Sequence, residues 1–224
     1  MLKDKRIRII CGHYGSGKTE FSINYSLALK KVEEKVAIAD MDIVNPYFRS
    51  REKAEFLRAQ GLKVIYSSIE GTALDIPAVT GEVGTLINND NWNFILDVGG
   101  DNVGARALGR YYETIKAHEY DLFFVINGYR PETSNVEDTI THLKAIESTT
   151  GLKVSGLINN THMMKHTTLE DVLMGQKLAE DVSMELNIPI KYISCIEEVA
   201  KELPQELKEK CIIASLIMRD SWMS

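Results

Sequence analysis

The chain alternates between short apolar runs and longer segments in which apolar residues recur every three to four positions. The short runs are continuously apolar, which is typical of strands in a sheet that is covered on both faces. The longer segments, such as the one with Phe21, Tyr25 and Leu29, have the spacing of amphipathic helices. Strands are predicted at residues 7–11, 36–39, 63–66, 94–96, 122–126, 154–158 and 190–193.

This alternation predicts an α/β fold with three layers: a mostly parallel sheet of about seven strands, with helices on both faces. No internal repeat, low-complexity tract or linker interrupts the pattern, so residues 1–224 are expected to form one domain. Near the end, the apolar residues of 207–218 do not gather into the single stripe of a membrane-binding helix. We expect this stretch to be a helix docked against the sheet.

Polar residues and glycines follow several of the predicted strands directly. They are Gly12 to Thr19 after the first strand, Asp40 and Asp42 after the second, Asp97 to Asp101 after the fourth, and Asn159 and Asn160 after the sixth. In open parallel sheets, ligands bind beyond the carboxyl ends of the strands. The sequence therefore predicts that these residues converge on one site.

The first of these segments, which we call the phosphate loop (residues 12–19), fits the motif G-x-x-x-x-G-K-S/T. It reads Gly12-His13-Tyr14-Gly15-Ser16-Gly17-Lys18-Thr19 and lies between a predicted strand and a predicted helix. In such a loop the backbone N–H groups turn inward around phosphate oxygens, and the helix N-terminus adds partial positive charge. We expect Lys18 to reach the β- and γ-phosphates and the Thr19 hydroxyl to bind Mg²⁺. A glycine-rich turn without a ligand is the alternative.

Carboxylates after two other strands complete the predicted magnesium site. Asp97 ends the apolar run 93–97, the Walker B pattern, and is expected at the metal with Thr19. Asp40 and Asp42 lie two residues apart, so one could support the magnesium hydration shell and the other could orient the attacking water. Gly100 would let a backbone N–H approach the γ-phosphate. Solvated carboxylates at a strand end remain the alternative for Asp40 and Asp42.

These motifs resemble the MinD/ParA/CobQ/CobB group of P-loop nucleotide-binding proteins. The resemblance rests on the phosphate loop, on Asp40-Met41-Asp42, on Asp97-Val98-Gly99-Gly100 and on Gly156-Leu157-Ile158-Asn159-Asn160. It implies a P-loop NTPase fold that binds ATP with Mg²⁺ and acts through a homodimer or another protein partner. It also implies catalytic roles for Lys18 and Asp42, and contact of Asn159 or Asn160 with adenine.

The chain departs from this group at His13, where many members carry a lysine that reaches the partner's nucleotide. A histidine is a shorter and weaker phosphate ligand. Adenine is favoured independently, since GTP-binding P-loop proteins usually read guanine with Asn-Lys-x-Asp and the chain contains no Asn-Lys dipeptide. The loop at residues 43–49 is predicted to be a switch or a partner-contact segment.

Composition mainly excludes classes of protein. Hydrophobic residues make up 44% and charged residues 26% of the 224-residue chain, which is ordinary for a globular domain. A net charge of -6 gives no general attraction to nucleic acid, so none is expected as a partner. The three cysteines form no C-x-x-C pair, and no apolar run approaches the length of about 20 residues that spans a membrane. A cytoplasmic protein without integral membrane contact is expected.

The predicted function is a Mg²⁺-dependent ATP-binding and ATP-hydrolysing switch, slow until a protein partner completes its site. Two alternatives stay open. One is an ATP-dependent enzyme that transforms a metabolite, a ligase, amidotransferase-type synthase or small-molecule kinase, with residues 67–91 shaping an acceptor site. The other is an assembly module that holds nucleotide without hydrolysing it. His162 and His166 could bind a soft metal, although a solvated or nucleotide-adjacent loop explains them as well.

Overall fold

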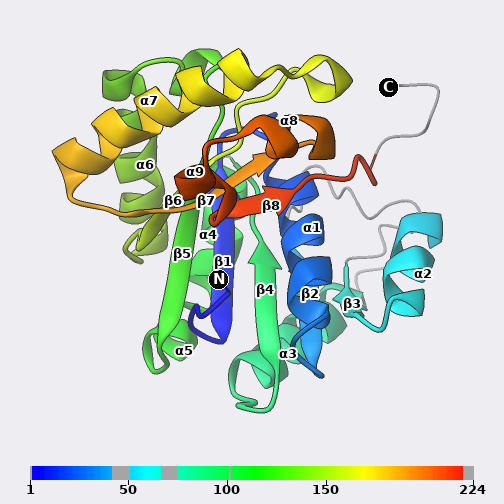
Figure 1. Ribbon diagram of the computed structural model, residues 1–224. Helices are drawn as coiled ribbons and strands as arrows, with labels where there is room; N and C mark the ends of the chain where they lie inside the picture. Colours follow the sequence, from blue (N-terminus) through cyan, green and yellow to red (C-terminus); the bar gives the residue numbers. More distant parts are fainter. Residues whose placement is uncertain (1, 42–50, 67–74, 101, 219–224) are drawn as a thin grey trace.

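A computed structural model describes residues 2–41, 51–66, 75–100 and 102–218 of the chain. Eight strands of these residues form one sheet, and each neighbouring pair is parallel (Figure 1). Across the sheet they are β3 (Lys63–Ile65), β2 (Val36–Asp40), β4 (Asn93–Asp97), β1 (Ile7–Gly12), β5 (Tyr120–Ile126), β6 (Gly156–Asn159), β7 (Ile190–Cys195) and β8 (Cys211–Ile213).

Helices cover both faces of this sheet. In chain order they are α1 (Lys18–Lys30), α2 (Arg51–Ala59), α3 (Asp75–Ile87), α4 (Asn102–Gly109), α5 (Tyr112–Lys116), α6 (Val136–Thr150), α7 (Leu169–Leu186), α8 (Glu197–Glu202) and α9 (Gln205–Lys208), with short 3₁₀ turns η2 (Pro131–Thr133) and η3 (Met164–His166). Helices α1 and α2 pack on one face, and α3 to α7 pack on the other. The predicted three-layer α/β arrangement is confirmed.

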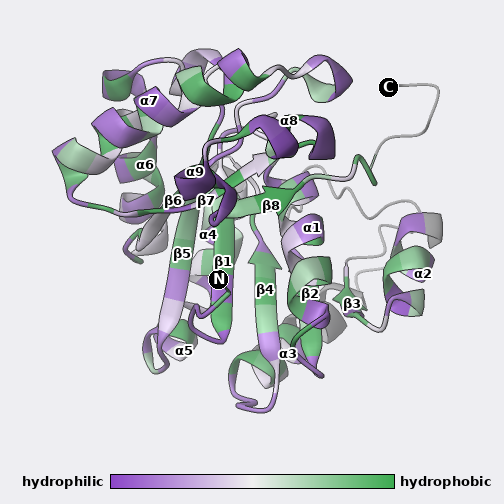
Figure 2. Ribbon diagram, in the orientation of Figure 1, coloured by the Kyte–Doolittle hydropathy of each residue, from purple (hydrophilic) through white to green (hydrophobic). Residues whose placement is uncertain are grey.

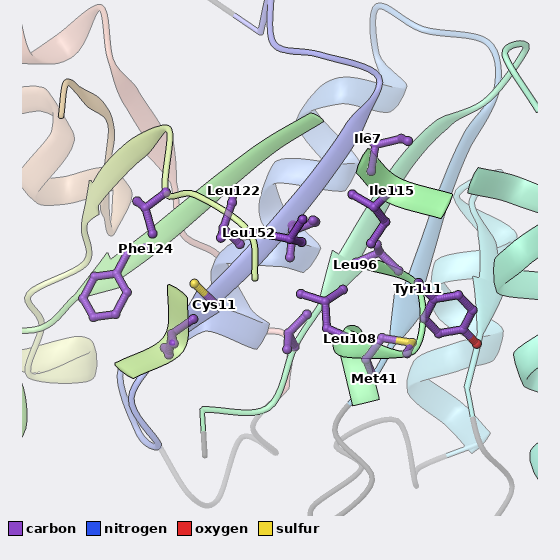
Figure 3. Packing of buried hydrophobic residues seen from close by; sticks show 14 of the residues in the cluster. Ile7, Cys11, Met41, Leu96, Leu108, Tyr111, Ile115, Leu122, Phe124 and Leu152 are labelled. Atoms are coloured by element: carbon purple, nitrogen blue, oxygen red, sulfur yellow. The ribbon is translucent and has the colours of Figure 1, made fainter. Parts of the chain in front are cut away.

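The strands are apolar along their length because successive side chains enter different cores. On β1, Ile9 and Cys11 belong to the core under α3 to α7, whereas Ile10 belongs to the core under α1 and α2. In the first of these cores, Ile7 and Leu96 from the sheet pack with Ile115 of α5 (Figure 3). Figure 2 shows the apolar strands at the centre and hydrophilic residues on α8 and α9.

The prediction for the end of the chain is wrong in one respect. Residues Cys211–Ile213 form β8, an eighth strand parallel to β7, where we expected a docked helix. Ile212 is buried in this strand, and Ile193 of β7 pairs with Cys211. A short β-branched run gains more from pairing with an exposed sheet edge than from continuing a helix.

The strand order brings the chemistry-bearing strands together. Strand β4 lies between β1 and β2, so Asp97 pairs in register with Ile10 on one side and with Asp40 on the other. Because all the strands are parallel, their carboxyl ends lie at one edge of the sheet. Among the described residues, none of the helices has the length and apolar character needed to cross a bilayer.

Candidate functional site

The phosphate loop connects β1 to α1 and depends on glycine at its last turn. Gly17 caps the N-terminus of α1 with φ at 82°, in the left-handed region that glycine adopts without strain. A Cβ atom there would also overlap the side-chain amide of Asn160. Within the loop, the Ser16 N–H donates to the His13 carbonyl at 3.1 Å. The turn therefore requires glycine for both its backbone conformation and its space.

Lys18 and Thr19 are the first two residues of α1, and both side chains are largely buried at the start of the helix. The unpaired N–H groups of a helix N-terminus carry partial positive charge. Together with the Lys18 ammonium, they make this point suited to a polyanion in a protein whose net charge is -6.

Two carboxylates lie next to this helix start, on neighbouring strands. Asp97 is 1% exposed and Asp40 is 5% exposed, and the two residues pair directly between β4 and β2. The hydroxyl of Ser22, one turn into α1, donates to Asp97 Oδ1 at 3.0 Å, which links the helix to β4. Hydroxyl and carboxylate oxygens are the ligand atoms that Mg²⁺ prefers, so the side chains of Thr19, Asp97 and Asp40 fit that ion.

Gly100 packs directly against the phosphate loop. A Cβ on this residue would overlap the carbonyl oxygen of Gly12 and would lie 2.7 Å from backbone atoms of both His13 and Tyr14. The segment after β4 thus touches the loop backbone. Three predicted features, Asp42, the loop at 43–49 and Asp101, lie outside the described residues.

His13 contacts Tyr14, Glu132 and His142. Its Nδ1 lies 2.8 Å from the Tyr14 carbonyl oxygen and 3.3 Å from Glu132 Oε2. Its ring meets the edge of the His142 ring, with 5.1 Å between centroids. Burial, aided by the nearby His13 and Lys18, lowers the pKa of His142 below 6.5, although Glu132 acts in the opposite direction.

A cavity of about 140 Å³ opens beside the start of α1. The predicted residues that line it are Gly15, Gly17, Lys18, Thr19 and Asn160, whereas Gly12, His13, Tyr14 and Ser16 lie outside its lining. Other parts of its wall come from the loop after β6, the end of β7 and the residues after β8. The phosphate loop therefore forms one side of a partly open cavity at the carboxyl edge of the sheet.

Two side chains hold the outer carbonyls of the phosphate loop. Arg130, in the loop after β5, donates from Nε to the Gly15 carbonyl at 2.8 Å. Asn160 donates from Nδ2 to the Ser16 carbonyl at 2.7 Å. Both residues also line the cavity. They keep the loop turned so that its N–H groups can serve a ligand.

The two adjacent asparagines have different surroundings. Asn159 is fully buried outside the cavity lining, where its Nδ2 donates to the Val172 carbonyl at 3.0 Å and its Oδ1 accepts from the Thr161 N–H at 3.1 Å. Those bonds join β6 to α7. Of the two candidates for contact with a base, Asn160 is the one at the cavity.

His162 and His166 do not share a helix face. His162 lines the cavity, and its Nδ1 accepts from the Met164 N–H at 3.3 Å, while His166 ends η3 and is exposed. Among the described residues, no group of three or more His, Cys, Asp or Glu side chains is placed to hold a metal ion.

The sequence reasoning missed several cavity residues. They are Glu20, Met164, Thr167, Ser194, Cys195, Ile196, Ala214, Leu216 and Met218. One signal was available for Ser194, because a polar residue at the end of a predicted strand belongs to the ligand edge. The predicted seventh strand stopped at residue 193, two residues before the end of β7.

Comparison with known proteins supports this reading of the fold. The chain resembles cell division protein FtsY from Thermotoga maritima, with a TM-score of 0.59 and 19% identity over 84% of this chain and 60% of that one. FtsY from Mycoplasma mycoides has a TM-score of 0.56 and 19% identity, over 87% of this chain and 61% of that one. The signal recognition particle receptor FtsY from Elizabethkingia anophelis, in complex with GDP, has a TM-score of 0.56 and 15% identity, over 87% of this chain and 58% of that one.

The chain thus spans about 60% of the length of these structures, and the likeness concerns the fold. The comparison with curated proteins found no match. The family model of the CobQ/CobB/MinD/ParA nucleotide-binding domain matches residues 8–172, which include the phosphate loop, Asp97 and Asn160. The chain therefore belongs to the CobQ/CobB/MinD/ParA nucleotide-binding domain family.

Proposed function

We propose that this protein is a Mg²⁺-dependent ATP-binding and ATP-hydrolysing switch, with residues 1–224 acting as one cytoplasmic nucleotide-binding domain. The observation that carries the proposal is the position of β4 beside β1, which sets the buried Asp97 next to the helix that begins with Lys18 and Thr19. This is the arrangement that phosphoryl transfer uses to neutralise a triphosphate and to hold its metal ion.

The chain's own groups divide the work on the triphosphate. Loop N–H groups and the Lys18 ammonium bind phosphate oxygens and neutralise charge that develops in the transition state. Thr19, Asp97 and Asp40 hold Mg²⁺, which when bound neutralises charge on the phosphate oxygens. Asp42, in the segment after β2, orients the attacking water. Gly100 brings the segment after β4 against the loop, where its backbone can respond to the γ-phosphate.

Adenine is the proposed base, although a GTPase is the competing case because one structural neighbour was solved with GDP. GTP-binding P-loop proteins usually read guanine with an Asn-Lys-x-Asp motif, and the chain has no Asn-Lys dipeptide. Among the described residues that line the cavity, Glu20 is the one carboxylate, and it accepts bonds from backbone N–H groups. ATP is therefore supported by two observations: the chain lacks the guanine motif, and the one carboxylate in the described lining bonds to backbone N–H groups of the chain itself.

The switch is proposed to act on a protein partner, a second copy of the chain or another protein. The motivating observation is that His13 is engaged by Glu132 and His142 in its own chain. A histidine with these contacts would supply less positive charge to a partner's nucleotide than a lysine does, so slow turnover by the isolated protein is expected.

Phosphate release from purified protein tests the proposal. ATP with Mg²⁺ should yield phosphate without any added metabolite, GTP should yield less, and Mg²⁺ removal should stop the reaction. Lys18→Ala and Asp42→Ala should abolish turnover, while Lys31→Ala, an exposed lysine at the end of α1, should leave it unchanged. Phosphate that appears only when a metabolite is added would instead support a substrate-transforming enzyme.

A further inference from the structure

One wall of the cavity beside the phosphate loop belongs to neither a helix nor a strand. It consists of residues 214–218, which we call the C-terminal strap. The strap follows β8 directly and passes the N-terminal end of α1 (Figure 1). Three of its residues, Ala214, Leu216 and Met218, line the cavity. A segment nearly two hundred residues from the phosphate loop thus lines the same cavity.

Two side chains of α1 hold the strap by its backbone. Asn24 and Ser215 form a reciprocal pair, in which Asn24 Nδ2 donates to the Ser215 carbonyl and the Ser215 N–H donates to Asn24 Oδ1, both at 2.9 Å. Glu20 accepts from the Ile217 N–H at 2.6 Å and from the Met218 N–H at 3.2 Å. Glu20 and Asn24 are four residues apart, so they lie on one face of α1.

This anchorage couples the strap to the phosphate end of the site. Glu20 comes directly after Thr19, and so the carboxylate that holds the strap lies in the first turn of the helix that starts at the phosphate loop. At the start of the strap, the Ala214 N–H donates to the Cys195 carbonyl of β7 at 2.8 Å, whereas the N–H groups of Ser215, Ile217 and Met218 donate to the two α1 side chains. Beyond residue 214, the position of the strap therefore depends on Glu20 and Asn24.

The chemistry of the cavity suits a flat, mostly apolar ring. Leu216 and Met218 of the strap line the cavity together with the apolar side chains of Met164 and Ile196. A cavity of about 150 Å³ holds one aromatic ring. The hydroxyl of Ser194 lines this space while it is buried and without a hydrogen-bond partner in the described structure.

An unpaired buried hydroxyl is costly, and it can either donate to a ring nitrogen or accept from an exocyclic amine. The lysine and arginine of the lining, Lys18 and Arg130, lie at the phosphate loop, so the apolar part of the cavity with its unpaired hydroxyl would receive a phosphate poorly. It would receive a nitrogen heterocycle well.

We propose that the C-terminal strap is the wall against which the nucleobase packs, that Glu20 and Asn24 are positioning residues that set the affinity for the base, and that the Ser194 hydroxyl contacts it. This inference rests on the proposed function, since the triphosphate is held by the phosphate loop. It adds a part of the chain beyond residue 172 to nucleotide recognition.

Calorimetric titration with two probes tests the role of the strap. The probes are ATP and inorganic tripolyphosphate, each with Mg²⁺, and the variants are Glu20→Ala and Asn24→Ala. Loss of bonds to the Glu20 carboxylate should weaken ATP binding by about 10- to 100-fold. Tripolyphosphate, which lacks a base, should bind each variant as it binds the wild type. The matched control is Ser215→Ala, which keeps the strap's backbone bonds and should change neither affinity.

Ser194→Ala separates base contact from a structural role. Without nucleotide, removal of an unpaired buried hydroxyl should leave the thermal unfolding midpoint unchanged or raise it. ATP binding should weaken several-fold, and tripolyphosphate binding should not change. Should Glu20→Ala fail to fold, Asn24→Ala and Ser194→Ala carry the same test.

Equal losses for ATP and tripolyphosphate would overturn the inference, and so would wild-type ATP affinity in all three variants. If the wild type binds neither probe, the proposed function fails as well. These outcomes are distinct, because failure of the strap inference alone leaves ATP bound by the wild type.

Discussion

Replacement of Gly100 by alanine measures how closely the segment after β4 must approach the phosphate loop. The added Cβ would overlap the Gly12 carbonyl oxygen and lie 2.7 Å from the His13 carbonyl carbon and the Tyr14 nitrogen. All three of these atoms are backbone, so no flexible side chain can turn away to make room. The loop, or the segment that carries residue 100, has to move by several tenths of an ångström.

The size of the effect follows from that displacement. Overpacking of a close-packed contact typically costs about 1–3 kcal/mol of unfolding free energy. A misplacement of about 1 Å at a reacting centre can cost about 10²-fold in rate. We therefore expect Gly100→Ala to remain folded, to unfold at lower urea concentration, and to lose about 10²-fold in ATP turnover, equivalent to about 2.7 kcal/mol.

Gly84→Ala is the matched control, because no atom beyond its chain neighbours and the nearby backbone of its own helix lies within 4 Å of the position that its Cβ would take. Gly84 lies inside α3, where alanine should add about 0.4–1 kcal/mol of stability and leave turnover unchanged. Urea unfolding and a phosphate-release assay give the two readouts. A folded Gly100→Ala protein with wild-type turnover would refute the reasoning that the loop works in contact with residue 100.

Three further substitutions have defined outcomes. Burial raises the pKa of Asp4, but hydrogen bonds from two tyrosines and a lysine outweigh burial, so the net pKa lies below 3.8. The stability that the ionised Asp4 contributes is therefore lost as the pH falls through its folded-state pKa. In urea titrations, Asp4→Asn should make the unfolding free energy less dependent on pH below about pH 4. Burial lowers the pKa of His142, so the unfolded state binds the proton more readily; the wild type should lose stability as the pH falls below 6.5, and His142→Leu should lack that slope. Ser22→Ala removes the hydroxyl that donates to Asp97, and should raise the Mg²⁺ concentration for half-maximal turnover about tenfold, whereas Ser26→Ala, which loses a bond to a backbone carbonyl, should not.

The sheet and the phosphate site were predictable because their signals are local. Continuous apolar runs marked seven strands within about two residues, and the loop motif needs only its own glycines and Lys18. β8 was missed because its three residues continue into further apolar positions, and only the free edge of β7 decides that they pair as a strand. The order of the strands in the sheet can be read only from the three-dimensional structure, because β4 lies between β1 and β2, which are consecutive in sequence.

The rest of the candidate site depends on side-chain direction. Asn159 and Asn160 are adjacent, so they point to opposite sides at the end of β6, and the sequence cannot tell which one meets the cavity. Glu20 reads as an ordinary acidic residue in a first helical turn. Its bonds to the strap join residues 197 and 198 positions apart, a distance that no local pattern encodes.

The central claim is that the phosphate loop binds a nucleoside triphosphate with Lys18 as its principal side-chain ligand. Titration of ATP into the wild type and into Lys18→Ala, both with Mg²⁺, tests it most directly. The account predicts one ATP per chain in the wild type, and an affinity about 10- to 100-fold lower in a folded Lys18→Ala protein, because bonds to a charged donor are lost. Equal ATP affinity in the two proteins would contradict it.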